Sequence, residues 1–396
     1  MRTDGWRQLL VWSAVWLGAV GCLEDFTDSA PCLPGQGRSA PEVIVGRDGG
    51  RFVAEEGRAA AFGGNAYFLL ESMRRGRVEE VEGTLELMAG LGMEVVRVWA
   101  FDNGGRRALH RGPGELDEEG LEALDEVIAM ASARGLRVLL VLGNYWPDYG
   151  GLPAYGEWAG VQGDAAIWGS AQVRAAYGEW VRAVVGRTNT VTGWPYATDP
   201  AIFGWEVTNE PRCVGAGCSP ELVAGFMGAM VSEVRRLDAV HLVGVGDEGF
   251  FGRYGVDAGL LVAGGEFDWV SLHLYPNRHE PLWGPDGGGA WVPTRAMAEA
   301  EERIDRSVEL ARRWDLPVLI GELGWPSDGG DDERAAMLGG MLAHARARGV
   351  GGALVWMVAA EAYPDYDGYT LHARAAPHTI ELLCRASAVF GMPVEP

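Results

Sequence analysis

The sequence predicts a single-domain (β/α)8 barrel, preceded by a β-hairpin. Three observations support this fold class. The 396 residues are 48% hydrophobic, which is enough for one large core, and no change of composition marks a second domain. Eight short apolar runs recur along the chain, and helical patterns separate them. The runs are Phe62–Phe68, Val95–Phe101, Val138–Leu142, Ile202–Val207, Leu242–Val245, Trp269–Tyr275, Val318–Gly321 and Ala353–Val358. A doubly wound open sheet is the alternative, but no glycine-rich phosphate loop follows the first run.

The hairpin is expected first, at residues 43–53, which read VIVGRDGGRFV. Two apolar runs flank the turn sequence RDGG, and this combination is typical of a hairpin. Between the later runs, apolar residues recur every three or four positions, as on one face of a helix. The clearest of these stripes are Val78–Met88, Leu121–Ala131 and Met337–Ala345, and each ends close to a glycine.

The first residues have the pattern of an export signal. Arg2 and Arg7 precede an apolar run of 12 residues, Leu9–Val20, which is too short to span a bilayer. Small residues follow at 19–21, as at a signal-peptide cleavage site. Together with Cys22 they resemble a bacterial lipoprotein signal, in which Cys22 would be acylated and become the mature N-terminus.

These patterns divide the chain into three parts. We expect a signal peptide of lipoprotein type at 1–22, a polar tether at 23–41 and the (β/α)8 barrel domain at 42–396. The protein would be exported, either anchored to a membrane through its lipid or secreted.

Export would permit disulfides. Apart from the lipidation candidate, four cysteines remain, and four cysteines allow three pairings. Cys213 and Cys218 flank a short glycine-containing loop and could bond locally, in which case Cys32 and Cys384 would join the two ends of the domain. The alternative is that some of the four are free, buried thiols.

The net charge of −22 indicates which partners the protein does not have. Phosphate backbones require clustered Lys and Arg, so nucleic acid is excluded, and an anionic substrate is disfavoured. A neutral partner fits best. The seven histidines are scattered without HExxH spacing and no CxxC pair occurs, so we expect neither a metal nor a cofactor.

In a TIM barrel the active site lies at the C-terminal ends of the strands. Glu210 follows the fourth apolar run and Glu322 the seventh, on roughly opposite sides of an eight-strand ring. Glycoside hydrolysis needs two carboxyl groups flanking one bond, and a close pair keeps one of them protonated as the acid. Arg97 and Tyr275 would keep the other ionised. One strand-end glutamate alone would more often be a surface or capping residue, but the pair, with Asn209, favours catalysis.

Six separated motifs also occur in order along the chain. They read RVWAF (97–101), NYWPDYGG (144–151), RTNTVTGWPYATDPAIFGWEVTNEPRC (187–213), GDEGF (246–250), HLYP (273–276) and YPDYDGYT (363–370). With the two glutamates, these motifs resemble the endo-β-1,4-mannanases of glycoside hydrolase family 5, in clan A, over nearly all of the chain from residue 42.

This resemblance implies a retaining double displacement, with Glu210 as acid/base and Glu322 as nucleophile. Asn209 would bind the 2-hydroxyl of the sugar in subsite −1, and Arg212 would reach the aglycone side. Arg97 and Tyr275 would position Glu322, and His273 would support the site. Trp356 would form the floor under the −1 sugar, and the cleft would be lined by Trp99, Asn144 and Glu248. For Trp99, Trp356 and His273 the alternative is ordinary core packing.

The resemblance therefore implies an endo-acting hydrolase of mannan, glucomannan or galactomannan, acting as a monomer. The alternatives are an endo-β-1,4-glucanase or a transglycosylase of the same family, or a non-catalytic glycan-binding barrel. Two departures from the family pattern stand out. The loop after the sixth run carries a glycine-rich insertion, and GELGW (321–325) replaces the more usual EEFG around the predicted nucleophile.

Overall fold

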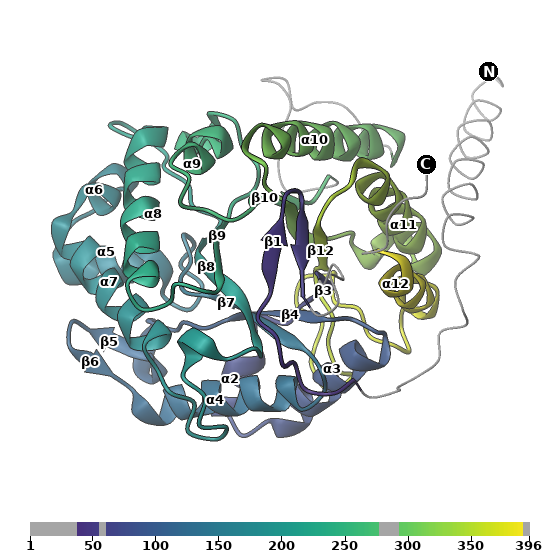
Figure 1. Ribbon diagram of the computed structural model, residues 1–396, viewed down its shortest axis with the longest axis horizontal. Coiled ribbons are helices and arrows are strands. Elements are labelled where there is room, and N and C mark those ends of the chain that lie inside the picture. The colour runs from purple at the N-terminus through teal and green to yellow at the C-terminus, as the bar shows by residue number, and fades with distance from the viewer. Residues whose placement is uncertain (1–37, 55–60, 277–292, 391–396) are drawn as a thin grey trace, which may run out of the picture.

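The structure is a computed structural model that describes residues 38–54, 61–276 and 293–390 (Figure 1). At its centre, eight parallel strands pair in the order β10-β11-β12-β3-β4-β7-β8-β9. The backbone N–H of Asp268, two residues before β10 begins, donates to the carbonyl of Val243 in β9, so the two outer strands meet and the ring closes. The strands are β3 (Phe62–Asn65), β4 (Val95–Trp99), β7 (Arg137–Val141), β8 (Ile202–Asn209), β9 (Leu242–Gly246), β10 (Val270–Leu274), β11 (Val318–Leu323) and β12 (Gly352–Val355). The predicted (β/α)8 barrel is confirmed.

Helices surround this ring, as Figure 1 shows. Each barrel strand reads as a continuous apolar run because the helices cover the outer face while the other face fills the barrel. The helices are α2 (Leu69–Arg74), α3 (Val78–Gly90), α4 (Glu118–Ser132), α5 (Gly151–Ala159), α6 (Asp164–Gly169), α7 (Ala171–Val185), α8 (Pro220–Arg235), α9 (Ala258–Ala263), α10 (Pro293–Trp314), α11 (Asp331–Arg348) and α12 (Pro377–Val389). A small antiparallel pair, β5 (His110–Gly112) and β6 (Glu115–Leu116), lies between β4 and α4.

The predicted N-terminal hairpin is also confirmed, as the antiparallel pair β1 (Gly46–Asp48) and β2 (Arg51–Val53). Phe52 of β2 is fully buried, and its ring lies 5.3 Å from that of Phe203 and 6.3 Å from that of Trp269. These side chains belong to a separate apolar cluster that the barrel strands share with Val45 and Ala61. The hairpin thus closes the N-terminal end of the barrel, and it is seen across the centre of the ring in Figure 1.

The strand ends differ from the apolar runs in a way that matters for the site. The first run continues to Phe68, but β3 stops at Asn65, whose side chain donates to the carbonyl of Gly321 at 2.9 Å. The last run continues to Val358, but β12 stops at Val355. In both places apolar residues beyond the strand pack against the core.

Several predicted features lie outside the described residues: the signal peptide at 1–22 with Cys22, most of the tether at 23–41, and Cys32. The Cys32–Cys384 disulfide therefore stays a prediction. Within the described ranges, no helix is both long enough and apolar enough to cross a bilayer.

Candidate active site

A cavity of about 360 Å³ opens at the C-terminal ends of the barrel strands. This is the size of a site for a small ligand or for one or two sugar units of a longer chain. Its walls are Trp99, Trp146, Asn209, Glu210, Arg212, Glu248, Phe250, His273, Tyr275, Arg303, Glu322, Trp356, Asp367 and Tyr369. The structure therefore brings together in one cavity nine of the residues that the sequence singles out.

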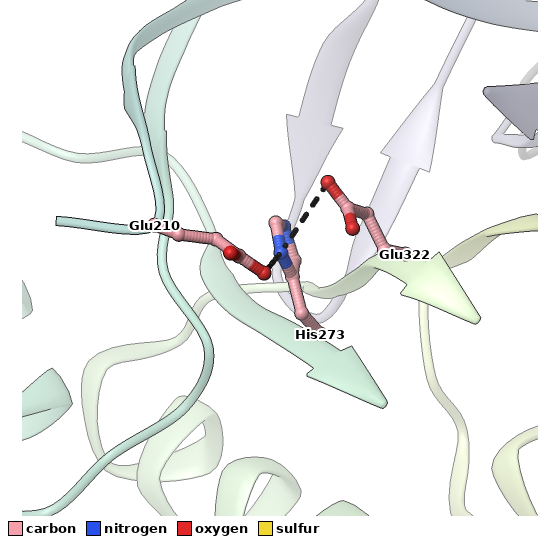
Figure 2. A group of neighbouring side chains, drawn as sticks. All are labelled: Glu210, His273 and Glu322. Carbon is pink, nitrogen blue, oxygen red and sulfur yellow. Dashed lines mark hydrogen bonds and ion pairs between the residues drawn. The ribbon is translucent and has the colours of Figure 1, made fainter. Parts of the chain in front are cut away.

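Glu210 and Glu322 face each other across this cavity, with His273 between them (Figure 2). The Nδ1 atom of His273 lies 2.8 Å from Oε1 of Glu210 and 3.5 Å from Oε1 of Glu322. One carboxylate oxygen of each glutamate lies within 4.8 Å of the other. The two carboxyl groups are thus close enough to act on the two sides of one bond, without the wider gap that a water between them and the sugar would need.

The backbone at the end of β8 directs Glu210 into the cavity. Its φ angle is +44°, a left-handed conformation that costs energy for a residue with a Cβ and that clusters at functional sites. The Glu210 N–H donates to the carbonyl of Gly246 at 2.7 Å, which holds the strained turn against β9. Pro211 follows and cannot continue the strand ladder.

Glu322 is held by a buried arginine. Arg97 is fully buried behind the cavity wall, and its Nη1 donates to Oε1 of Glu322 at 2.7 Å and to Oδ1 of Asn65 at 3.0 Å. Its Nη2 donates to Oδ1 of Asn209 at 2.6 Å, and its Nε donates to Oε2 of Glu206 at 2.7 Å. Burial alone would lower the pKa of Arg97, but its carboxylate partners outweigh burial and raise it, so the guanidinium stays charged.

The second oxygen of Glu322 accepts a hydrogen bond from the Tyr275 hydroxyl at 2.6 Å. Burial and the neighbouring Glu210 carboxyl group raise the pKa of Glu322, while the charge of Arg97 and the Tyr275 hydrogen bond oppose that rise. Burial also raises the pKa of Tyr275 well above its ordinary value, so the phenol remains a donor. Both oxygens of Glu322 are therefore fixed by donors that favour its ionised form.

Glu210 has a different environment. Its Oε2 accepts from the indole N–H of Trp146 at 2.7 Å, and its Oε1 contacts His273. Burial raises the pKa of Glu210, despite the Trp146 hydrogen bond and the charge of Arg212. Burial also lowers the pKa of His273, which is 2% exposed. The Nδ1 atom of its neutral imidazole can therefore accept a hydrogen bond from the O–H of a protonated Glu210. Burial thus raises the pKa of both carboxyl groups, and they differ in their donors: Glu322 accepts from the charged Arg97, whereas Glu210 accepts from the neutral indole of Trp146.

Residues 45–338 match the family described as GH family 5 beta-mannosidase-like. The chain belongs to glycoside hydrolase family 5. It is 34% identical to a putative mannan endo-1,4-beta-mannosidase 5 of Oryza sativa subsp. japonica, over 90% of this chain and 78% of the relative.

Solved structures agree. The endo-beta-1,4-mannanase from Thermotoga petrophila superposes with a TM-score of 0.73 at 27% identity, covering 85% of this chain and 78% of that one. The Rhizomucor miehei endo-1,4-beta-mannanase gives 0.75 at 24% identity, covering 87% and 99% of the two chains, which supports the same barrel fold.

On one side of Glu210 and Glu322, Arg212 forms a polar wall of the cavity. Its guanidinium makes two parallel hydrogen bonds to Glu248, at 2.7 and 2.6 Å, and lies 4.8 Å from the ring of Trp146 and 4.4 Å from that of Tyr254. Burial and the nearby charge of Glu210 raise the pKa of Glu248 to about 7 even with this arginine beside it.

A disulfide holds the same wall. Cys213, next to Arg212, bonds to Cys218 with Cα atoms 5.4 Å apart, as the sequence predicts. The Cys213 N–H also donates to the carbonyl of Tyr254 at 2.7 Å, and Ser219 then caps α8 by accepting from the N–H of Leu222. The disulfide, the Tyr254 contact and the helix cap together leave little freedom to the loop that carries Arg212.

On the opposite side, aromatic rings dominate. Trp356 lines the cavity, stacks on Tyr67 with centroids 5.3 Å apart and planes at 5°, and donates from Nε1 to Asp367 at 3.1 Å. Trp99 is 8% exposed and packs against Tyr67 at 4.8 Å, so it serves the core and still presents an edge to the cavity. Flat aromatic faces of this kind suit the apolar faces of sugar rings.

Asn144 is the one predicted cleft residue that lies behind the cavity instead of lining it. It is 1% exposed, and its Oδ1 accepts from Nδ2 of Asn209 at 3.1 Å. Asn144 and Asn209 also form an isolated bridge, because β7 and β8 run side by side to their ends. Asn144 therefore acts on the site through Asn209.

Three residues that the sequence reasoning left without a role belong to the site. Trp146 binds Glu210, and it stands beside Asn144 in the NYWPDYGG motif. Arg303 of α10 donates to the carbonyl oxygens of Glu248 at 2.6 Å and His273 at 2.8 Å. The sequence feature that could have identified Arg303 is a charged residue on the apolar face of a helix. Glu206 binds Arg97, and its signal is a charge in the middle of an apolar strand.

Two glutamates and a histidine are also residue types that bind metals, and one ligand atom from each can be found within 4.8 Å of the others. A cation there would lie beside the guanidinium of Arg97, which already contacts Glu322 at 2.7 Å. The arrangement fits proton transfer better, because the positive charge that a metal would supply to Glu322 is present as Arg97.

Proposed function

We propose that this chain is a retaining, endo-acting hydrolase of β-1,4-mannosidic linkages in mannan, glucomannan or galactomannan. One observation carries the proposal: a carboxylate oxygen of Glu210 and one of Glu322 lie within 4.8 Å of each other. Retaining enzymes have carboxyl groups about 5–5.5 Å apart, while inverting enzymes need roughly 6.5–9.5 Å to admit a water.

In the first step, an oxygen of Glu322 attacks the anomeric carbon while Glu210 gives its proton to the glycosidic oxygen. The bond to the leaving sugar breaks, and a covalent glycosyl–enzyme ester forms on Glu322. Arg97 and Tyr275 keep Glu322 ionised and oriented for attack. Burial keeps the pKa of Glu210 raised, which favours the protonated form that this step consumes.

In the second step, Glu210 takes a proton from water, and the resulting hydroxide attacks the anomeric carbon. The ester to Glu322 breaks, and the product leaves with its original anomeric configuration. Asn209 is placed between Arg97 and Asn144 so that its amide can bind the sugar 2-hydroxyl, a contact expected to strengthen in the transition state. Trp356 would lie beneath the sugar in subsite −1.

Binding of the leaving-group side falls to Arg212 and Glu248, whose paired geometry offers several donors and acceptors to sugar hydroxyls. The substrate assignment rests on the relatives: the rice and Thermotoga proteins above are named as mannan-cleaving enzymes. The neutral polysaccharide also fits the net charge of −22, which disfavours anionic partners.

Residues 1–22 would direct export, Cys22 would carry a lipid after cleavage, and residues 23–41 would tether the barrel to the membrane. We propose that the barrel works as a monomer.

The test is a reducing-sugar screen on mannan, glucomannan, xylan and carboxymethyl cellulose with the wild type and Glu210→Gln and Glu322→Ala. The proposal expects release from mannan and glucomannan, and losses of at least about 10³-fold in both variants, since each lacks a group that makes or breaks the bond. Release from carboxymethyl cellulose but not from mannan would replace the mannanase by an endoglucanase. Longer oligosaccharide products would indicate transglycosylation, and an inactive wild type that binds mannan would indicate a glycan-binding barrel.

A further inference from the structure

Glu206 is a third buried carboxylate beneath the catalytic pair. It belongs to β8, four residues before Glu210, and its side chain is fully buried together with that of Arg97. Its Oε2 accepts from the Arg97 Nε at 2.7 Å, while the other edge of the same guanidinium serves Glu322. A single arginine thus joins Glu206 to the predicted nucleophile through two short ion pairs.

Two glycines, one on each of the strands that flank β10, leave the room for this arrangement. A Cβ built on Gly246 of β9 would lie 2.8 Å from Nη2 of Arg97 and 2.9 Å from Oε2 of Glu206. A Cβ on Gly321 of β11 would lie 3.0 Å from Nε2 of His273 and 3.6 Å from Oε1 of Glu206. A larger residue at Gly246 would therefore press on the Arg97–Glu206 pair, and one at Gly321 would press on His273.

The second oxygen of Glu206 faces the other half of the site. Oε1 of Glu206 and Nε2 of His273 are both buried and have no hydrogen-bond partner among the described residues. Both lie close to the same point beside Gly321, 3.0 and 3.6 Å from a Cβ built there, and the charge of Glu206 acts on the His273 imidazole. His273 in turn contacts Glu210 through Nδ1. Glu206 is therefore connected to Glu210 through His273 and to Glu322 through Arg97.

We propose that Glu206 is a positioning residue for the catalytic pair, which orients Arg97 and offsets its positive charge so that Glu210 remains the proton carrier at working pH. This inference rests on the proposed function for the meaning of the two glutamates. It adds a residue that touches neither the sugar nor the reacting atoms and acts through Arg97 and His273.

The sign of the effect follows from the charges around Glu206. Its direct electrostatic partners are Arg97 from β4 and His273 from β10. Around the catalytic pair that these two residues contact lie Tyr275 after β10, Asp247 and Glu248 after β9, and Arg212 and Arg303. Without the negative charge of Glu206, the positive charge of Arg97 is offset by one carboxylate fewer. The anionic forms of both catalytic glutamates are then favoured, so both of their pKa values fall.

Glu206→Gln is the test, because a glutamine of the same shape can still accept from the Arg97 Nε. A unit charge about 10 Å away at an effective dielectric constant of about 20 shifts a pKa by about one unit. We expect both limbs of the pH profile of kcat/KM on mannan to move to lower pH by about one unit. Glu206→Asp restores the charge and should return the limbs toward the wild type, even if its shorter side chain lowers kcat.

The matched control is Glu80→Gln, which removes another buried carboxylate with an arginine partner, Arg77, on the outer helix α3. Its limbs should stay where those of the wild type are. If Glu206→Gln lowers activity but leaves both limbs of the kcat/KM profile in place, Glu206 has only a packing role and the proposal is overturned. A Glu206→Gln profile identical to that of the wild type would also overturn it.

A readout without substrate separates this inference from the proposed function. Carboxyl ¹³C NMR titration of glutamate-labelled protein, with Glu210→Gln used to assign the signal, measures the pKa of Glu210 directly. A lower pKa in Glu206→Gln supports the inference even if mannan is not the substrate, and an unchanged pKa refutes it even if mannan is.

Discussion

The Tyr275 hydroxyl offers the sharpest perturbation of the site, because Tyr275→Phe removes one oxygen and keeps the ring. That oxygen donates to Oε2 of Glu322 at 2.6 Å, inside a buried pocket where the other oxygen is held by Arg97. A hydrogen bond to a charged group contributes about 1.5–3 kcal/mol. If the contact mainly stabilises the ionised nucleophile, its loss should raise the pKa of Glu322 by about one to two units, since one unit corresponds to about 1.4 kcal/mol.

The sign can be followed through the pH profile. Glu322 must be ionised to attack, so the acidic limb of kcat/KM reports its protonation in the free enzyme. Removing the donor should move that limb to higher pH by about one to two units and leave the basic limb in place. Below the limb, kcat/KM should fall about 10- to 100-fold relative to the wild type.

The assay is initial-rate hydrolysis of soluble mannan from pH 3 to 9, with thermal unfolding as a check of the fold. Tyr254→Phe is a suitable control, since Tyr254 packs on Arg212 at the rim, away from Glu322. An acidic limb that stays in place in Tyr275→Phe would refute the reasoning, because Tyr275 would then not stabilise the charge of Glu322.

Three further perturbations follow from the described contacts. Gly246→Ala places a Cβ 2.8 Å from Nη2 of Arg97, so activity on mannan should fall at least about tenfold, as expected when overpacking costs about 1–3 kcal/mol, whereas Gly225→Ala, which meets nothing within 4 Å, should keep full activity. Cys213→Ser opens a disulfide with a sequence separation of 5, and the loop-entropy relation gives about 2 kcal/mol; calorimetry should show a lower Tm, with a raised KM, and an unchanged Tm would contradict the role given to the loop. Asp125→Asn breaks a buried ion pair and should destabilise the fold by about 3 kcal/mol in urea unfolding at pH 7. Hydrogen bonds outweigh burial and lower the pKa of Asp125, so its contribution is present above pH ~4 and lost as the pH falls, and the two proteins should converge in acid; a constant difference would contradict this.

Most of the fold could be predicted because the barrel strands are buried on both faces and read as continuous apolar runs. The ends of those runs were less certain. The run from Phe62 passes the end of β3 without interruption, because residues beyond Asn65 are still apolar and pack on the core. Apolar content marks burial, and it does not mark where a ladder stops.

The polar tips of strands indicated the two glutamates, Arg97, His273 and Tyr275, since the barrel geometry brings strand ends to one mouth. The contacts among them depend on side-chain direction and on neighbours far apart in the chain. Arg303 comes from a helix that shares no motif with the strand ends, and Glu206 looks like an anomaly in an apolar strand until Arg97 is placed beside it. A strand-end motif also does not show how deeply a side chain is buried. Asn144 was therefore expected to line the cleft, but it lies behind it.

The central claim is a double displacement through Glu322, and the anomeric form of the first product tests it most directly. Time-resolved ¹H NMR of mannohexaose hydrolysis would follow the anomeric protons before mutarotation mixes them. The account predicts that the β-anomer appears first and the α-anomer later. An α-anomer at the earliest times would contradict it, because inversion would require a water between the sugar and a carboxylate that the geometry places within 4.8 Å of its partner.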